Sequence, residues 1–124
     1  MSLRIVVADD DPFIRRLVAF TLTKFGYEVL EACDGAAALN LVRDVRPDLV
    51  VLDVLMPEMD GLEVTRALVQ DPTTSNIPIL ILSANAQRSD IEAGLESGAS
   101  AYVTKPFEPK VLGERVAELL GKNA

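Results

Sequence analysis

Short apolar runs alternate with amphipathic stretches along this chain. The runs cover residues 3–8, 27–32, 49–52, 79–82 and 101–104. Each is short and bounded by turn residues, which favours strands, and the unbroken aliphatic runs favour strands buried on both faces of a parallel sheet. Strand and helix patterns alternate five times, so the sequence predicts a single doubly wound α/β domain with right-handed crossovers.

The stretches between these runs repeat apolar residues at helical spacing. We expect helices over residues 12–25, 36–45, about 62–69, about 89–97 and about 109–120. Asp11 followed by Pro12 is typical of a helix start, because aspartate caps the first turn and proline fits the first helical position. Ser89 with Glu92 three residues later predicts a capping box for the fourth helix, and Gly98 predicts its end.

The third apolar run ends abruptly in Asp53, which a loop containing Pro57 and Gly61 follows. In open α/β sheets the ligand crevice lies outside the carboxyl ends of the strands. A carboxylate buried there without partners would cost several kcal/mol, so the chain has to supply a cation, hydrogen-bond donors or water. We therefore expect Asp53 to be a functional residue.

Polar residues also follow the first, fourth and fifth apolar runs. Asp9 and Asp10 come after the first, Ser83 after the fourth and Lys105 after the fifth. Because parallel strands place these ends at one edge of the sheet, we expect the side chains to converge on Asp53. Carboxylates close together repel, so at least one carboxyl pKa should be raised. Only oxygen ligands are on offer, which favours Mg²⁺ or Mn²⁺ over zinc or copper.

The charges of this set suggest its chemistry. Three carboxylates, one lysine and one Mg²⁺ sum to about zero, which leaves room for an anion such as a phosphoryl group. A carboxylate can also accept that group as an acyl phosphate. Phosphorylated Asp53 would carry more negative charge and more acceptor oxygens, which could draw Ser83 and Lys105 toward it. Each residue alone has an ordinary structural explanation, and only the combination indicates function.

Composition narrows the function classes. A net charge of −7 argues against direct nucleic-acid binding, which needs a basic face. No apolar run approaches the roughly 20 residues of a membrane span and no signal peptide is evident, so we expect a soluble cytoplasmic protein. The absence of histidine excludes a Ser-His-Asp site and histidine-bound zinc. Cys33, the single cysteine, is expected to be a passive, partly buried thiol.

Together these residues resemble the receiver domains of two-component response regulators, and in extent the chain is similar to the single-domain chemotaxis type. The resemblance covers essentially the whole chain, and it implies one receiver domain over residues 1–124 with a flavodoxin-like sheet of strand order 2-1-3-4-5. The matching segments are VVADDDP at 6–12, LDVLMP at 52–57, DG at 60–61, LSA at 82–84, GA at 98–99 and YVTKPF at 102–107.

The resemblance implies a phosphoacceptor and a metal site. Asp53 would accept the phosphoryl group. Asp10 would bind Mg²⁺ directly and Asp9 at least partly through water, with Asp53 and the backbone carbonyl of Leu55 as further ligands.

It also implies a switch. Ser83 and Lys105 would contact the phosphoryl group, and Tyr102 would change rotamer on activation. The Lys105–Pro106 peptide is usually cis in this family. The signalling surface is usually formed by the fourth helix, the fifth strand and the fifth helix.

The partners follow from the same resemblance. Because the chain has no histidine, a phosphohistidine donor would be another protein, either a sensor histidine kinase or a histidine phosphotransfer protein. The chain would not be an enzyme in the usual sense, since it would catalyse only its own phosphorylation and dephosphorylation. Output would lie in a separate protein or in a domain outside this sequence, and both stay open, as does a phosphorylation-dependent homodimer.

Departures from the family pattern are small. Ser83 stands where threonine is more frequent, and Ser100 and Ala101 replace a common acidic pair. Leu55 and Asn85 occupy positions that vary in the family and tune dephosphorylation, and leucine at position 55 cannot orient an attacking water. We therefore expect a long-lived phosphorylated state.

Three other functions compete with this one. A receiver-shaped interaction module that takes no phosphate is the main alternative, although all the site residues are retained. A flavin-binding flavodoxin is disfavoured, because the three aspartates at 9–11 would repel a flavin phosphate. A haloacid-dehalogenase-type phosphatase needs an acid two residues after the nucleophile, where this chain has Leu55.

Overall fold

The computed structural model describes residues 2–121 and contains one parallel sheet in the order β2-β1-β3-β4-β5. The strands are β1 (Arg4–Ala8), β2 (Glu28–Ala32), β3 (Leu49–Leu52), β4 (Ile79–Ser83) and β5 (Ala101–Thr104). Each neighbouring pair runs parallel. The predicted doubly wound, flavodoxin-like sheet is therefore confirmed, including its strand order.

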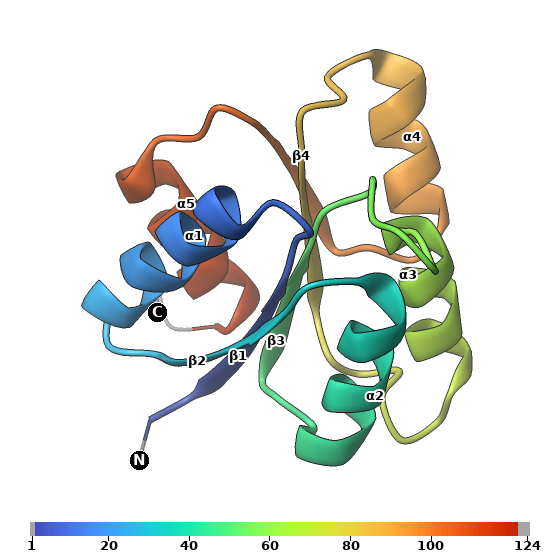
Figure 1. Ribbon diagram of the computed structural model, residues 1–124, viewed down its shortest axis with the longest axis horizontal. Coiled ribbons are helices and arrows are strands. Elements are labelled where there is room, and N and C mark those ends of the chain that lie inside the picture. Colours follow the sequence, from blue (N-terminus) through green and yellow to red (C-terminus); the bar gives the residue numbers. More distant parts are fainter. Residues whose placement is uncertain (1, 122–124) are drawn as a thin grey trace.

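Helices cover both faces of the sheet (Figure 1). On one face lie α1 (Pro12–Lys24) and α5 (Pro109–Leu119), and on the other α2 (Gly35–Val45), α3 (Gly61–Gln70) and α4 (Arg88–Glu96). Right-handed crossovers between parallel strands produce this division. None of the helices within residues 2–121 is long and apolar enough to cross a membrane.

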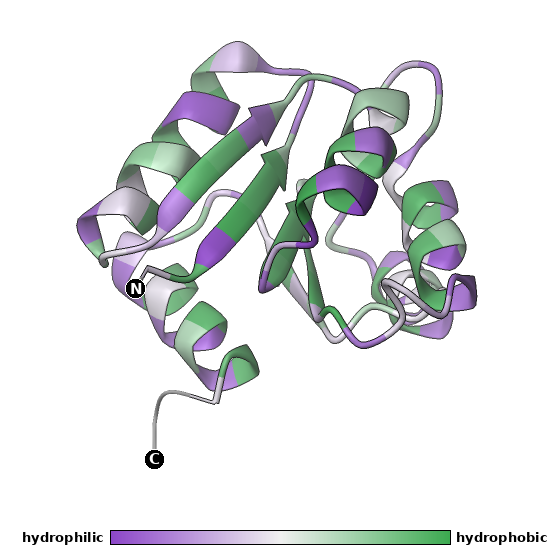
Figure 2. Cartoon of the chain, turned by 90° about the horizontal axis from the view of Figure 1, so that it is seen from below, coloured by the Kyte–Doolittle hydropathy of each residue, from purple (hydrophilic) through white to green (hydrophobic). Residues whose placement is uncertain are grey.

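The core has two apolar clusters, one on each face of the sheet. Ile5 and Val7 of β1 pack in the cluster that includes α1 and α5, whereas Val6 and Ala8 pack in the cluster that includes α2 and α3. Figure 2 shows the resulting apolar strands between helices of mixed hydropathy. Every residue of β3 and β4 is buried, which explains their unbroken aliphatic sequences.

The start of α1 was predicted correctly. The Asp11 carboxylate accepts hydrogen bonds from the backbone amides of Phe13 at 2.9 Å and Ile14 at 3.4 Å. Gly26, with φ of 96°, follows the last turn, as expected for a glycine helix stop. The expectation for Cys33 was wrong in part, because this thiol is exposed just after β2.

The capping box predicted at Ser89 is wrong. The α4 helix begins earlier, because the backbone carbonyl of Gln87 accepts from the amides of Asp90 at 3.0 Å and Ile91 at 3.1 Å. Gln87 is therefore the N-cap, and its side chain makes no capping hydrogen bond. Glu92 instead pairs with Arg88 one turn before it, at 3.1 Å.

Candidate functional site

The carboxyl edge of the sheet brings the predicted polar residues together. Oxygen atoms of Asp9, Asp10 and Asp53 lie within 4.8 Å of one another. The Lys105 ammonium donates hydrogen bonds to Asp9 Oδ2 at 2.8 Å and to Asp53 Oδ2 at 3.2 Å. Ser83, the last residue of β4, lies at the same edge of the sheet.

Burial makes this cluster electrostatically demanding. Asp9 and Asp53 are only 4% and 9% exposed, and Lys105 is largely covered. Taking a carboxylate out of water costs several kcal/mol unless charge and hydrogen bonds offset it. Lys105 supplies a positive charge and a hydrogen bond to each of the two carboxylates, Asp9 and Asp53. Its backbone amide donates to the Ser83 carbonyl at 2.8 Å, and its peptide bond to Pro106 is cis, as the resemblance implied.

The pKa values of the pair shift for different reasons. Burial raises the pKa of Asp53, the positive charge of Lys105 opposes this, and the charge of Asp9 raises it further. The predicted raised carboxyl pKa is thus confirmed, but desolvation outweighs the expected repulsion as its cause. Burial alone would lower the pKa of Lys105, but the hydrogen bond to Asp9 and the charges of Asp53 and Asp9 raise it overall. Lys105 therefore stays protonated at neutral pH.

The loop after β3 is folded tightly against Asp53. The Gly61 amide donates to the Val54 carbonyl at 2.9 Å. A Cβ atom at Gly61 would lie only 2.1 Å from the Asp53 carbonyl oxygen, so the loop can close only over glycine. A capping box between Asp60 and Glu63, which was not predicted from the sequence, fixes the start of α3. Leu55 lies on this loop with 63% of its surface exposed.

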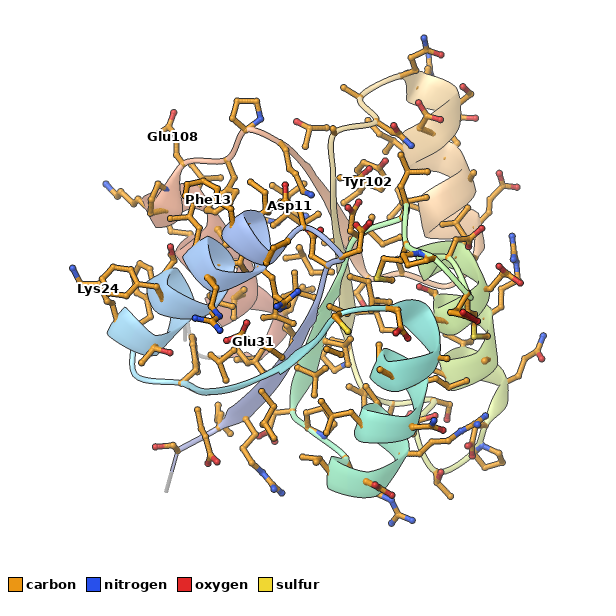
Figure 3. The ribbon with its side chains drawn as sticks, in the orientation of Figure 1. Asp11, Phe13, Lys24, Glu31, Tyr102 and Glu108 are labelled. Atoms are coloured by element: carbon orange, nitrogen blue, oxygen red, sulfur yellow. The ribbon has the colours of Figure 1, made fainter. Side chains whose placement is uncertain are left out.

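Ser83 and Tyr102 are linked through one residue of the loop after β4. The Asn85 amide donates to the Ser83 hydroxyl oxygen at 3.1 Å, which leaves the hydroxyl proton free to be donated elsewhere. The Asn85 carbonyl accepts from the Tyr102 hydroxyl at 2.7 Å. Tyr102 is half-buried, and its ring packs on Gly94 of α4. Figure 3 labels Tyr102 in the region between the sheet and α4. The change of rotamer of Tyr102 stays a prediction.

The loop after β1 is held by two residues that were not predicted from the sequence. The guanidinium of Arg15 donates through Nη1 to the Asp9 carbonyl at 3.0 Å and through Nε to Glu31 Oε1 at 3.0 Å. The Asp9 carboxylate also accepts from the Asp11 amide at 3.0 Å. The contact between Arg15 and Glu31 joins α1 to β2, so only the register of β1 against β2 could have indicated it.

The donor set of the cluster fits a hard divalent cation. Within residues 2–121, the grouped metal-ligating side chains offer carboxylate oxygens alone, which suit Mg²⁺ or Mn²⁺. Asp10 is exposed, so the cluster is open to solvent on one side.

Fold and site together define a class of protein, namely flavodoxin-like α/β domains with a lysine-bridged acidic cluster at the carboxyl edge of the sheet. The family model described as response regulator receiver domain matches residues 5–117. The chain belongs to this family, as the resemblance implied.

Individual relatives agree with this assignment. The DNA-binding response regulator MtrA of Mycolicibacterium smegmatis is 44% identical over 123 residues, which are 99% of this chain and 53% of that protein. The chain thus spans about half the length of the curated relatives it matches.

Solved structures agree as well. A putative response regulator from Chloroflexus aurantiacus superimposes with a TM-score of 0.94 at 36% identity, covering 98% of this chain and 99% of that one. A second solved structure is the receiver domain of sensor histidine kinase PA1611 from Pseudomonas aeruginosa, which has a magnesium ion in its active-site cleft. It superimposes with a TM-score of 0.91 at 28% identity, covering 98% of this chain and 99% of that one.

Proposed function

We propose that this chain is a phosphorylation-activated switch of a two-component system, in which Asp53 accepts the phosphoryl group. The observation that carries the proposal is the placement of Asp53. It is a nearly buried carboxylate at the ligand-binding edge of the sheet, 3.2 Å from the Lys105 ammonium and grouped with two more carboxylates. A carboxylate in such surroundings is suited to nucleophilic catalysis rather than to packing.

Mg²⁺ is the cation that the cluster would hold, with Mn²⁺ as a substitute. Of the grouped carboxylates, Asp10 and Asp53 would bind it directly and Asp9 at least partly through water. The Leu55 backbone carbonyl would be a further ligand, as the family resemblance implies. When bound, the cation supplies charge neutralisation for the oxygens of the transferring group. The magnesium ion in the cleft of the PA1611 receiver supports this choice.

The chain's own residues would then perform the transfer. An Asp53 carboxylate oxygen attacks phosphorus, and the bond from phosphorus to the donor's histidine nitrogen breaks. The departing imidazole keeps the electron pair of that bond and takes a proton from solvent water. Lys105, whose pKa is raised, remains charged and can neutralise a phosphoryl oxygen. The Ser83 hydroxyl, whose proton is not used in the hydrogen bond with Asn85, can donate that proton to a second phosphoryl oxygen. In this proposal the chain catalyses only its own phosphorylation and the later hydrolysis of the acyl phosphate.

Asn85 offers a route from this chemistry to the surface. Any movement of Ser83 toward the phosphoryl group disturbs the hydrogen bond from the Asn85 amide, and the Asn85 carbonyl in turn anchors Tyr102. The ring of Tyr102 packs on α4, so the surface made by α4, β5 and α5 would change.

Membership of the receiver family supports proposals for the phosphoryl donor and for the output partner. The phosphoryl donor would be a sensor histidine kinase or a histidine phosphotransfer protein, since this chain has no histidine. MtrA is a DNA-binding response regulator of about twice the matched length. By analogy, output would come from a domain outside this sequence or from a separate protein, and this acidic domain would not bind DNA itself. The extent of the domain over 1–124, its cytoplasmic location and homodimerisation stay predictions.

Intact-mass spectrometry after incubation with Mg²⁺ and acetyl phosphate tests the proposal. We expect the wild type to gain one phosphoryl group, and we expect none in EDTA or in Asp53→Asn. Size-exclusion chromatography of the same samples reports any dimerisation. If Asp53→Asn still gained a phosphoryl group, another residue would be the acceptor. An unlabelled wild type would favour the interaction module.

A further inference from the structure

Asp10 differs from the other two carboxylates of the cluster. Lys105 hydrogen-bonds to Asp9 and Asp53, whereas the exposed Asp10 side chain has no hydrogen-bond or ion-pair partner among residues 2–121. Its place in the cluster therefore depends on its backbone, and above all on the peptide that joins it to Asp9.

That peptide is held from outside the cluster. Its carbonyl oxygen, which belongs to Asp9, accepts from Arg15 Nη1 at 3.0 Å. The Arg15 side chain is only 14% exposed, and its Nε is bound to Glu31 at 3.0 Å. Figure 3 shows Glu31 on β2 beside α1, the helix that carries Arg15. With both contacts made, the planar guanidinium cannot rotate without breaking one of them.

We propose that Arg15, oriented by Glu31, is a positioning residue that sets the Mg²⁺ affinity of the site by fixing the Asp9–Asp10 peptide. The inference rests on the proposed function. The hydrogen bonds of the Arg15 guanidinium go to Glu31 and to the Asp9 carbonyl, so it would act through the position of the Asp10 carboxylate rather than as a ligand. Partners that orient metal ligands in this way commonly change metal affinity by about 10-fold or more when they are removed.

The direction in which Mg²⁺ affinity changes when Arg15 is replaced distinguishes a positioning role from a purely electrostatic one. Arg15 carries a positive charge near a cation site, so removing that charge alone should tighten Mg²⁺ binding. Loss of the hydrogen bond to the Asp9 carbonyl should weaken it. Arg16 provides a matched control, because its Nε lies 3.5 Å from the same Glu31 oxygen while its side chain is 77% exposed. Within residues 2–121 it forms no hydrogen bond or ion pair with Asp9.

The test is isothermal titration of the unphosphorylated protein with Mg²⁺, using the wild type, Arg15→Met, Arg15→Lys and Arg16→Met, with circular dichroism to verify folding. We expect Arg15→Met to bind Mg²⁺ about 10-fold more weakly. Arg15→Lys should be weaker by a smaller factor, because it keeps the charge but cannot span both acceptors. Arg16→Met should bind as the wild type or slightly more tightly.

The outcomes distinguish this inference from the proposed function. A wild type that binds no Mg²⁺ would overturn both. A wild type that binds, with Arg15→Met equal to it or tighter, would overturn the inference alone, and so would an equal loss in Arg16→Met. If Arg15→Met fails to fold, Arg15→Lys decides, and an affinity equal to the wild type would refute the positioning role.

Discussion

At Asp53 two requirements oppose each other. The carboxylate has to be shielded from bulk water, which strengthens its interactions with ions, yet it has to stay ionised to act as a nucleophile. Burial raises its pKa, and Lys105 at 3.2 Å limits that rise. Lys105 is thus both a candidate for phosphoryl binding and the residue whose charge favours the ionised form of Asp53.

The cost of this burial should be measurable as stability. Because the folded pKa of Asp53 lies above its unfolded value, the ionised form destabilises the fold at neutral pH, and this cost vanishes below the unfolded pKa of about 4. Without Mg²⁺, Asp53→Asn should therefore raise the free energy of unfolding at pH 7. The gain should disappear near pH 3. Urea unfolding at both pH values checks this, and a variant less stable than the wild type at pH 7 would contradict it.

Leu55 should govern how long the acyl phosphate survives. Its exposed side chain lies on the loop after Asp53 and offers no polar atom to orient an attacking water. Leu55→Asn should hydrolyse the phosphorylated state roughly tenfold faster, followed as loss of the phosphorylated mass after acetyl phosphate is removed. Decay at the wild-type rate or slower would show that Leu55 does not protect the phosphoryl group.

At the scale of elements, the boundaries that depend on local sequence could be predicted and those that depend on contacts between elements could not. Asp11 and Gly26 bracket α1 as expected, because caps and glycine stops act within one turn. The start of α4 was misplaced, since the loop after β4 sets it and Ser89 only resembles a cap. Buried β3 and β4 were evident as continuous aliphatic runs.

Replacement of the α4 cap should stabilise that helix. Gln87 has the extended backbone of an N-cap, with φ −71° and ψ 152°, but no capping side-chain bond. Gln87→Ser should raise the free energy of unfolding by about 0.5–1 kcal/mol in urea titrations. Ser89→Ala is the control and should change stability little. A loss of 1 kcal/mol or so in Ser89→Ala would restore the capping box that the structure rejects.

The closure of the β3–α3 loop over Asp53 should tolerate no side chain at Gly61. A Cβ atom there meets the Asp53 backbone oxygen at 2.1 Å, and a backbone atom cannot rotate away. Gly61→Ala should cost about 3 kcal/mol in stability. Gly26→Ala, where nothing lies within 4 Å but φ is 96°, should cost only about 1–2 kcal/mol. Equal costs in thermal unfolding would mean that the loop yields easily.

At the scale of the whole molecule, the topology gathers residues that are far apart in the sequence. The class of fold and the convergence of Asp9, Asp53 and Lys105 could be predicted, because parallel strands share a carboxyl edge. The Arg15–Glu31 anchor and the Asn85 link could not, since they require the register of neighbouring strands and the path of a loop. The first of these contacts ties the backbone of Asp9 to α1 and β2, and the second ties Ser83 to Tyr102 on β5.

The most direct measurement of the central claim is a crystal structure of the protein with Mg²⁺ and beryllofluoride, a mimic of the acyl phosphate. We expect beryllofluoride on a carboxylate oxygen of Asp53, Mg²⁺ held beside it by Asp10, and the Lys105 ammonium turned from Asp53 to a fluorine. Beryllofluoride and Mg²⁺ absent from the space between these three residues, in crystals that contain both, would contradict it.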